Sequence, residues 1–177
     1  MEKKTEDFIN FIKSRKSTRT FIFEKIEKEK IEKILECASW APSGLNNQPW
    51  KVNVVSHPTL KRMLAENTKY GEIIEGAYYT LVIFLDQKKC YNRVKDIQSI
   101  GAFMENILLG AHALNLGAVW LGEILNKKEK INEMFKLNNE DFELMGVIAI
   151  GMKDMVKEEK LTEERKRILV DNFTEWY

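Results

Sequence analysis

The sequence predicts a domain in which helices and strands alternate, and three observations support this fold class. Helical patterns, with apolar residues three and four positions apart, recur at residues 29–38 and 94–116. Short apolar segments rich in β-branched residues lie between and after them, at residues 51–56, 78–85 and 144–150. Proline and glycine are scarce, at 3 and 9 residues, so few segments are interrupted. Taken alone, this alternation favours a doubly wound parallel sheet.

Length and composition favour one compact unit. A chain of 177 residues suits a single hydrophobic core, so we expect one domain over residues 1–177. Apolar residues make up 44% of the chain, which is enough to build that core. Cys37 and Cys90 lie far apart, and the charged start at residues 1–7 lacks the apolar run of a signal peptide. We therefore expect a cytoplasmic protein with free thiols.

The charge balance excludes two classes of partner. The 28 basic and 27 acidic residues leave a net charge of +1, which provides no summed positive field for nucleic acid or an anionic membrane. The longest apolar stretch, residues 78–85, is far shorter than the roughly 20 residues of a membrane-spanning helix. Small molecules are the expected partners.

Two helices are expected in the first part of the chain. A capped, acidic start at residues 5–7 leads into apolar residues at helical spacing. The second helix, 29–38, has one apolar face and stops at the turn-forming residues 41–44. A strand at 51–56 and a helix at 59–66 follow, separated by His57-Pro58.

The centre of the chain contains the strongest patterns. Residues 78–85 are apolar throughout and short, which indicates a central strand covered on both faces. Residues 94–116 form a long helix with a broad apolar stripe, expected in the core or at a subunit interface and ended by Gly117.

The last third contains three shorter elements and an apolar tail. A strand or turn at 119–124 and a helix at 128–135 precede the final strand, 144–150. The tail is charged from Glu158 and ends in apolar residues that need a surface to pack against. These are Ile168, Leu169, Val170, Phe173 and Trp176.

A basic segment follows the first helix. Arg15-Lys16-Ser17-Thr18-Arg19 combines three cations with two hydroxyls, groups that bind phosphate oxygens. The segment therefore fits a phosphate clamp. The alternative is a solvated stretch of ordinary cations at a helix end.

An amide-rich loop follows the second helix. It reads Ala41-Pro42-Ser43-Gly44-Leu45-Asn46-Asn47-Gln48-Pro49-Trp50. Amide side chains offer donors and acceptors, which suit the edge of a heteroaromatic ring such as a flavin. The alternative is a turn whose amides bind only the local backbone.

These two segments, in this order and at this distance, resemble the paired signature of FMN-dependent nitroreductases. The similarity continues through Asp96 to Gly122, including Trp120-Leu121-Gly122, and ends with Gly151 and the basic triplet Arg165-Lys166-Arg167. The resemblance implies an α+β fold in place of the parallel sheet: a three-layer α/β/α domain with a mixed, mostly antiparallel central sheet. It also implies an intertwined homodimer in which each tail wraps the other subunit.

The resemblance carries over to residues that match the family's motifs. The FMN phosphate would be held by Arg15, Lys16, Ser17 and Arg19, together with Arg165 and Arg167 from the tail. The isoalloxazine ring would contact Pro42, Ser43, Gly44 and Asn46, typically of the partner subunit, with Gln48 supporting their loop. Leu121, Gly122 and Glu123 would lie along the ring.

The resemblance implies a ping-pong oxidoreductase without a catalytic side chain. NADH or NADPH would give hydride to the flavin, which would then reduce a nitroaromatic, a quinone or another conjugated acceptor. Three alternatives remain: a dehalogenase-type relative, an FMN-binding sensor or carrier without turnover, and a dimeric interaction protein. The chain has no cluster of His, Cys and carboxylate residues at the spacing of metal ligands, so we expect no metal site. We also expect no functional role for His57 or His112.

Overall fold

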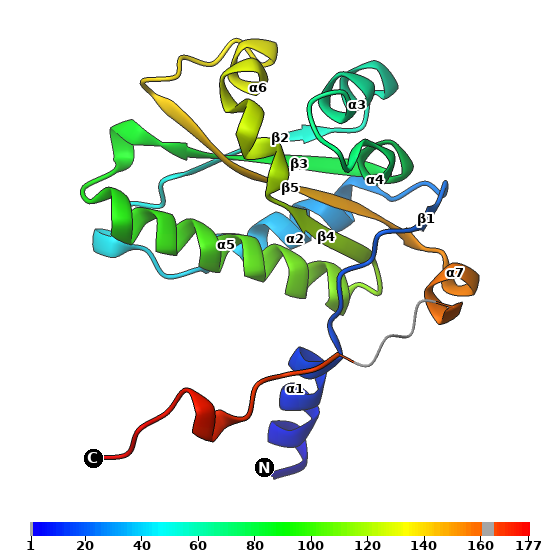
Figure 1. Ribbon diagram of the computed structural model, residues 1–177, viewed down its shortest axis with the longest axis vertical. Helices are drawn as coiled ribbons and strands as arrows, with labels where there is room; N and C mark the ends of the chain where they lie inside the picture. The colour runs from blue at the N-terminus through cyan, green and yellow to red at the C-terminus, as the bar shows by residue number, and fades with distance from the viewer. Residues whose placement is uncertain (1, 161–164) are drawn as a thin grey trace.

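The computed structural model describes residues 2–160 and 165–177 of the chain. Its body has three layers, in which a twisted sheet lies between two layers of helices (Figure 1). Helices α2 (Lys28–Ser39) and α5 (Arg93–Ala113) cover one face of the sheet. Helices α3 (Pro58–Ala65), α4 (Gly71–Gly76) and α6 (Lys128–Met134) cover the other. The expected α+β class and three-layer architecture are confirmed.

The central sheet has the strand order β1-β5-β3-β2, and β4 also pairs with β5. Its strands are β1 (Phe21–Ile22), β2 (Trp50–Val55), β3 (Tyr79–Asp86), β4 (Gly117–Leu121) and β5 (Phe142–Lys153). Every strand pairing among the described residues is antiparallel. The parallel sheet that the alternation alone suggested is therefore wrong. Apolar periodicity reports which faces of a strand are buried, and it carries no information about the direction of the neighbouring strand.

Strand β3 lies at the centre of the fold, as its unbroken apolar sequence predicts. Its alternate residues Leu81 and Ile83 pack into the core beneath α2 and α5. Val82 and Phe84, which point the other way, pack beneath α3, α4 and α6. All four side chains are fully buried, so the strand contributes to both hydrophobic cores.

Short turns connect the regular elements. One-turn 3-10 helices lie at η1 (Gly44–Asn46), η2 (Gln87–Lys89), η3 (Glu123–Lys127) and η4 (Val170–Asn172). None of the helices in the described part of the chain is long and apolar enough to cross a membrane.

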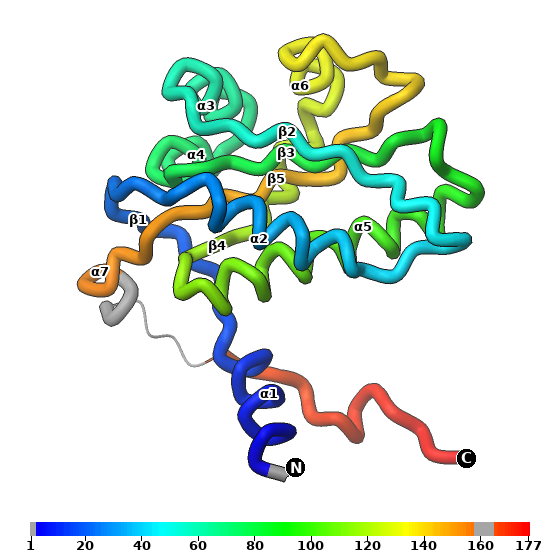
Figure 2. Tube along the Cα trace, turned by 180° about the vertical axis from the view of Figure 1, so that it is seen from behind, coloured from blue at the N-terminus to red at the C-terminus, as the bar shows by residue number. Residues whose placement is uncertain are grey.

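Both ends of the chain extend away from the three-layer body. Helix α1 (Glu2–Ser14) and the segment 165–177 project from the same side in Figures 1 and 2, while α7 (Met155–Lys160) follows β5. Their apolar side chains are largely uncovered: Phe8 is 63% exposed, Phe173 61% and Trp176 86%. Such surfaces are characteristic of segments that pack against another molecule.

The end of the long helix differs from the sequence prediction. Helix α5 stops at Ala113, and Asn115 adopts the left-handed conformation, with φ 57°, that was expected of a later glycine. Gly117 instead begins β4, where a Cβ atom would lie 2.6 Å from Thr18 Cγ2. Gly117 is therefore needed for close packing and not for ending the helix.

Candidate functional site

The basic segment that follows α1 is attached to the start of β4. The Thr18 N–H donates to the Ala118 carbonyl at 3.0 Å. The Thr18 side chain is almost fully buried against Gly117, which has no side chain to hinder this approach. These contacts hold the basic segment against the start of β4.

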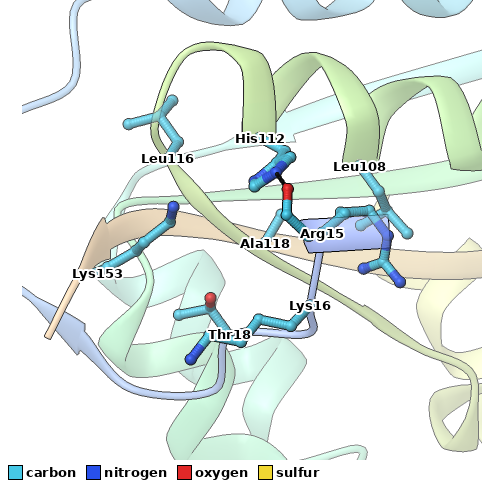
Figure 3. A pocket seen from close by; sticks show the side chains of 9 residues that line it. Arg15, Lys16, Thr18, Leu108, His112, Leu116, Ala118 and Lys153 are labelled. Atoms are coloured by element: carbon cyan, nitrogen blue, oxygen red, sulfur yellow. Dashed lines mark hydrogen bonds between the residues drawn. The ribbon is translucent and has the colours of Figure 1, made fainter. Parts of the chain in front are cut away.

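A small cavity of about 60 Å³ lies between this segment and the end of α5 (Figure 3). Its lining comes from distant parts of the chain: Ser14, Arg15, Lys16, Thr18, Leu108, His112, Leu116, Ala118 and Lys153. Arg15, Lys16 and Lys153 give it a positive character, and no carboxylate is among the described residues that line it. We call this cavity the clamp pocket.

Arg15 has an unfilled hydrogen-bonding site at the clamp pocket. Its Nε lies 3.5 Å from Glu105 Oε1, but its Nη1 is buried and has no acceptor among the described residues. A buried guanidinium nitrogen without a partner is costly, since the lost hydration is not replaced. A phosphate oxygen in the pocket would supply the missing acceptor.

The structure brings one tail arginine to the clamp segment. Arg165 donates through Nη2 to the Lys13 carbonyl at 2.7 Å and through Nη1 to the Arg15 carbonyl. Arg167 donates to the carbonyl of its neighbour Lys166 at 3.0 Å, and to no other residue that the structure describes. Arg19 is exposed, and neither Arg19 nor Arg167 lines the clamp pocket.

His112 and Lys153 line the clamp pocket although neither of them was predicted from the sequence to have a role there. Lys153 is the last residue of β5, and it reaches the pocket through the pairing of β1 with β5. His112 Nε2 lies 2.8 Å from Ser14 Oγ. Burial and the nearby charges of Lys153, Arg15 and Arg165 lower the pKa of His112 below its ordinary value.

The amide-rich loop has an unusual backbone conformation. Leu45, Asn46 and Gln48 have positive φ angles of 55°, 54° and 47°. The Gln48 N–H donates to Ser43 Oγ at 3.1 Å, and Gln48 Nε2 donates to Asn46 Oδ1 at 3.2 Å. Gln48 therefore lies where it can support the loop. Several residues at positive φ are characteristic of sites whose shape matters for binding.

A buried carboxylate anchors the loop to α5. Asp96 accepts from Asn47 Nδ2 at 2.7 Å and from the N–H groups of Tyr91 and Asn92 at 3.0 and 2.9 Å. Burial acts to raise the pKa of Asp96, but these hydrogen bonds outweigh it and the pKa is lowered. Asp96 thus joins the loop, the turn before α5 and the helix itself.

A groove of about 390 Å³ lies beside the loop. It is lined by Pro42, Ser43, Gly44, Lys95, Gln98, Ser99 and Ala102, so three of the predicted ring contacts face α5. The Tyr91 ring packs directly against Gly44, where a side chain would collide with it. Lys95 Nζ lies 5.3 Å from the centre of that ring.

The clamp pocket and the loop groove lie toward opposite ends of α5. On α5 the groove is lined by Lys95, Gln98, Ser99 and Ala102, and the pocket by Leu108 and His112. At a helical rise of about 1.5 Å per residue, the nearest of these positions, Ala102 and Leu108, are about 9 Å apart along the axis. The two cavities share no described lining residue. One chain therefore does not place the two predicted contact segments around one cavity.

The turn after β4 continues from a strand that borders the clamp pocket. Ala118 lines the pocket, Leu121 ends the same strand and Gly122 follows it. The Leu121 side chain is buried in the core, so only its backbone is available to a ligand, whereas the position around Gly122 is open. Glu123 accepts from Thr68 Oγ1 at 2.7 Å and from the Lys69 N–H at 3.1 Å, and these bonds lower its pKa.

Similarity to known proteins extends along most of the chain. The model of the Nitroreductase family matches residues 12–70 and 59–152. A protein of Archaeoglobus fulgidus named NADH dehydrogenase/NAD(P)H nitroreductase is 32% identical over 149 residues, covering 82% of this chain and 85% of that protein. The crystal structure of a nitroreductase from Desulfovibrio desulfuricans in complex with FMN is 37% identical, covers 96% of each chain and gives a TM-score of 0.87. An iodotyrosine deiodinase of Nematostella vectensis is 35% identical, but over only 44% of this chain and 29% of that protein.

Proposed function

Because the chain belongs to the nitroreductase family, we propose that it transfers hydride from NADH or NADPH, through bound FMN, to a nitroaromatic, quinone or similar conjugated acceptor. Its class, an FMN-dependent oxidoreductase, follows from the family and from the FMN-bound structure that it resembles over nearly its whole length. The acceptor and the ping-pong order of the reaction are our proposal.

The observation that carries the proposal is the clamp pocket. Its cations, and above all the unpaired Arg15 Nη1, fit the phosphate of FMN. We assign the phosphate to Arg15, Lys16, Ser17 and Arg19, with Arg165 and Arg167. The position of Arg165 across the backbone of this segment supports its inclusion, because a cation there adds to the same field.

We assign the ring of FMN to residues from two copies of the chain. The turn Leu121, Gly122 and Glu123 continues from the strand that borders the clamp pocket. The loop residues Pro42, Ser43, Gly44 and Asn46, supported by Gln48, lie beside a separate groove, and none of them lines that pocket. In a homodimer of single-domain chains (residues 1–177), the partner's loop supplies this second set of contacts.

The residues around the ring act by positioning and not by chemistry. When bound, FMN supplies a ring that accepts and returns a hydride. The neutral amides and backbone groups of the loop can hydrogen-bond the ring edge in each redox state without adding a net charge. The groove beside the loop, with Tyr91 and Lys95 at its border, leaves space for a flat molecule to stack on the ring.

Steady-state kinetics test turnover and its order. NADH or NADPH is varied at several fixed concentrations of a nitroaromatic, a quinone and a halogenated tyrosine, and double-reciprocal plots are compared. Parallel lines with the nitroaromatic or quinone are expected, because donor and acceptor use the same site in turn. Turnover with the halogenated tyrosine alone would instead favour the dehalogenase-type alternative. Absence of turnover with all three acceptors would favour a sensor or carrier.

A further inference from the structure

We propose that His112 is a further phosphate-binding residue, and that it takes up a proton when the phosphate of FMN enters the clamp pocket. This inference rests on the proposed function, because it assumes that the pocket holds that phosphate. It follows from the position of His112 on the pocket wall, among cations that come from three separate segments of the chain.

The imidazole of His112 lies in the wall of the clamp pocket, in the last turn of α5 (Figure 3). The Phe11 ring covers it at a centroid distance of 4.9 Å, and Ser14 Oγ lies 2.8 Å from Nε2. Arg15, Lys16 and Lys153 share the pocket with it. A group on this wall would face a bound phosphate together with those cations.

The hydrogen bonds of Ser14 indicate which ring nitrogen can gain a proton. Ser14 Oγ donates to the Phe11 carbonyl at 2.8 Å. On that basis we assign the proton of the neutral ring to Nε2, which donates to Ser14 Oγ, and Nδ1 is left without a proton. Protonation therefore occurs at Nδ1 and keeps the bond to Ser14.

The charges around His112 keep it neutral while the pocket holds no anion. Burial disfavours the imidazolium, as do Lys153 of β5, Arg15 of the clamp segment and Arg165 of the tail. Lys16 adds a further positive charge to the same pocket. The nearest acid on α5, Glu105, is paired with Arg15, whose charge it partly offsets.

A bound phosphate reverses this balance. A dianion in the pocket attracts the imidazolium more strongly than the surrounding cations repel it, and the C-terminal end of α5 also favours a cation. The site then takes one proton from solvent and releases none. By linkage, the affinity for FMN falls as pH rises through the pKa of His112 in the complex, by at most about tenfold per pH unit.

The sign of this effect separates it from titration of FMN itself. The second pKa of a phosphate monoester is about 6, so ionisation of the ligand strengthens binding to cations as pH rises and is complete near neutrality. Between about pH 7 and about pH 8.5, a loss of affinity must therefore come from the protein.

Flavin fluorescence, which is quenched in the complex, measures the dissociation constant for FMN across this range. For the wild-type protein we expect at least a threefold rise, roughly, between the two pH values. His112→Gln keeps a donor for Ser14 Oγ but does not titrate, so its dissociation constant should change by less than about twofold. Riboflavin, which lacks the phosphate, should show no difference in slope between the two proteins.

A second measurement does not depend on the His112 variant. The chain has two histidines, and His57→Asn leaves His112 alone while retaining an acceptor at the start of α3. The NMR signal of the remaining imidazole then gives its pKa with and without FMN, and a rise on binding is expected. An unchanged pKa, or equal slopes for wild type and His112→Gln, would overturn the inference. Failure of FMN to bind at any pH would instead overturn the proposed function.

Discussion

Arg15 and Asp96 each secure one of the two segments assigned to FMN. Arg15 presents a buried, unpaired guanidinium nitrogen to the clamp pocket. Asp96 accepts three hydrogen bonds from the loop and the turn before α5. The first residue is expected to bind the cofactor directly and the second to position the residues that contact it.

Replacing Arg15 by alanine should weaken FMN binding by about tenfold to a hundredfold, because one or two charge-assisted hydrogen bonds are lost. Flavin retained after gel filtration, and the dissociation constant from fluorescence, measure the effect. Arg93→Ala provides the control, since Arg93 pairs with Glu143 at 2.7 Å outside the clamp pocket. Equal flavin content in both variants would reject the assignment of Arg15.

Replacing Asp96 by asparagine should destabilise the fold at neutral pH by about 2–3 kcal/mol, because the buried network loses its negative charge and one of its two acceptor oxygens. The pKa of Asp96 is lowered in the fold, so its contribution is fully present above the unfolded pKa, about 3.9, and is lost as pH falls through the folded value. The difference between variant and wild type should therefore shrink below about pH 4.

Urea unfolding at fixed protein concentration measures both parts of this prediction. Asp141→Asn is the matched control, because Asp141 forms an exposed pair with Lys88 at 2.7 Å and should cost less than about 1 kcal/mol. A difference between Asp96→Asn and wild type that stays constant down to about pH 3 would contradict the role given to the ionised carboxylate.

At the scale of single residues, the sequence indicates site residues that lie in motifs. It misses the residues that only the fold brings to the clamp pocket. Arg15 and Asn46 stand in compact runs whose chemistry is visible without a structure. Lys153 and His112 reach the clamp pocket through strand pairing and helix packing. Their local patterns are those of an ordinary surface lysine and an ordinary core histidine, so periodicity could not select them.

Among the elements, β4 and α5 set the geometry of the site. The start of β4 lies against Thr18 and so holds the clamp segment, while the length of α5 separates that segment from the loop groove. The tight connection between the two elements depends on Asn115 at positive φ and on Gly117 beneath Thr18.

Substituting Gly117 by alanine should displace the clamp segment. The new Cβ would lie 2.6 Å from Thr18 Cγ2 and 3.1 Å from Lys153 Cγ, so the chain must shift at a cost of about 1–3 kcal/mol. FMN affinity should fall together with stability. Gly76→Ala is the control, because no atom lies within 4 Å of the new Cβ and the substitution should not destabilise the fold. Equal affinities in the two variants would contradict this view of β4.

The elements themselves were largely predictable from the sequence. Apolar periodicity located α2, α5 and β3, because an element that is buried on one or both faces has apolar residues at a regular spacing in the sequence. It did not locate α4 or β1, whose short spans of six and two residues contain too few positions to show a period. The antiparallel direction of the strands came from the family resemblance, since the alternation of elements alone indicated the opposite.

At the scale of the whole molecule, one chain has an incomplete site and uncovered apolar ends. The loop groove and the clamp pocket lie toward opposite ends of α5 and share no described lining residue. Helix α1 and the tail extend away from the body (Figure 2). They expose Phe8, Phe173 and Trp176. A homodimer in which the ends of each chain pack on the other subunit would account for both features.

Mixing two defective variants tests whether each site draws on two chains. Arg15→Ala breaks the clamp and Asn46→Ala breaks the loop, so each homodimer alone should retain little FMN. After the two are unfolded and refolded together, hybrid dimers contain one site with both segments intact. The mixture should then recover about a quarter of the wild-type flavin content. No recovery, with dimers present, would show that clamp and loop act within one chain.

The most direct measurement is the visible absorption spectrum of the purified protein, before and after NADH or NADPH is added in the absence of oxygen. The account predicts flavin bands that bleach on addition of the nucleotide and return when a nitroaromatic or quinone is admitted. Bands that persist in the presence of both nucleotides would contradict the proposed hydride transfer. A protein that shows no flavin bands, even after incubation with FMN, would contradict the whole account.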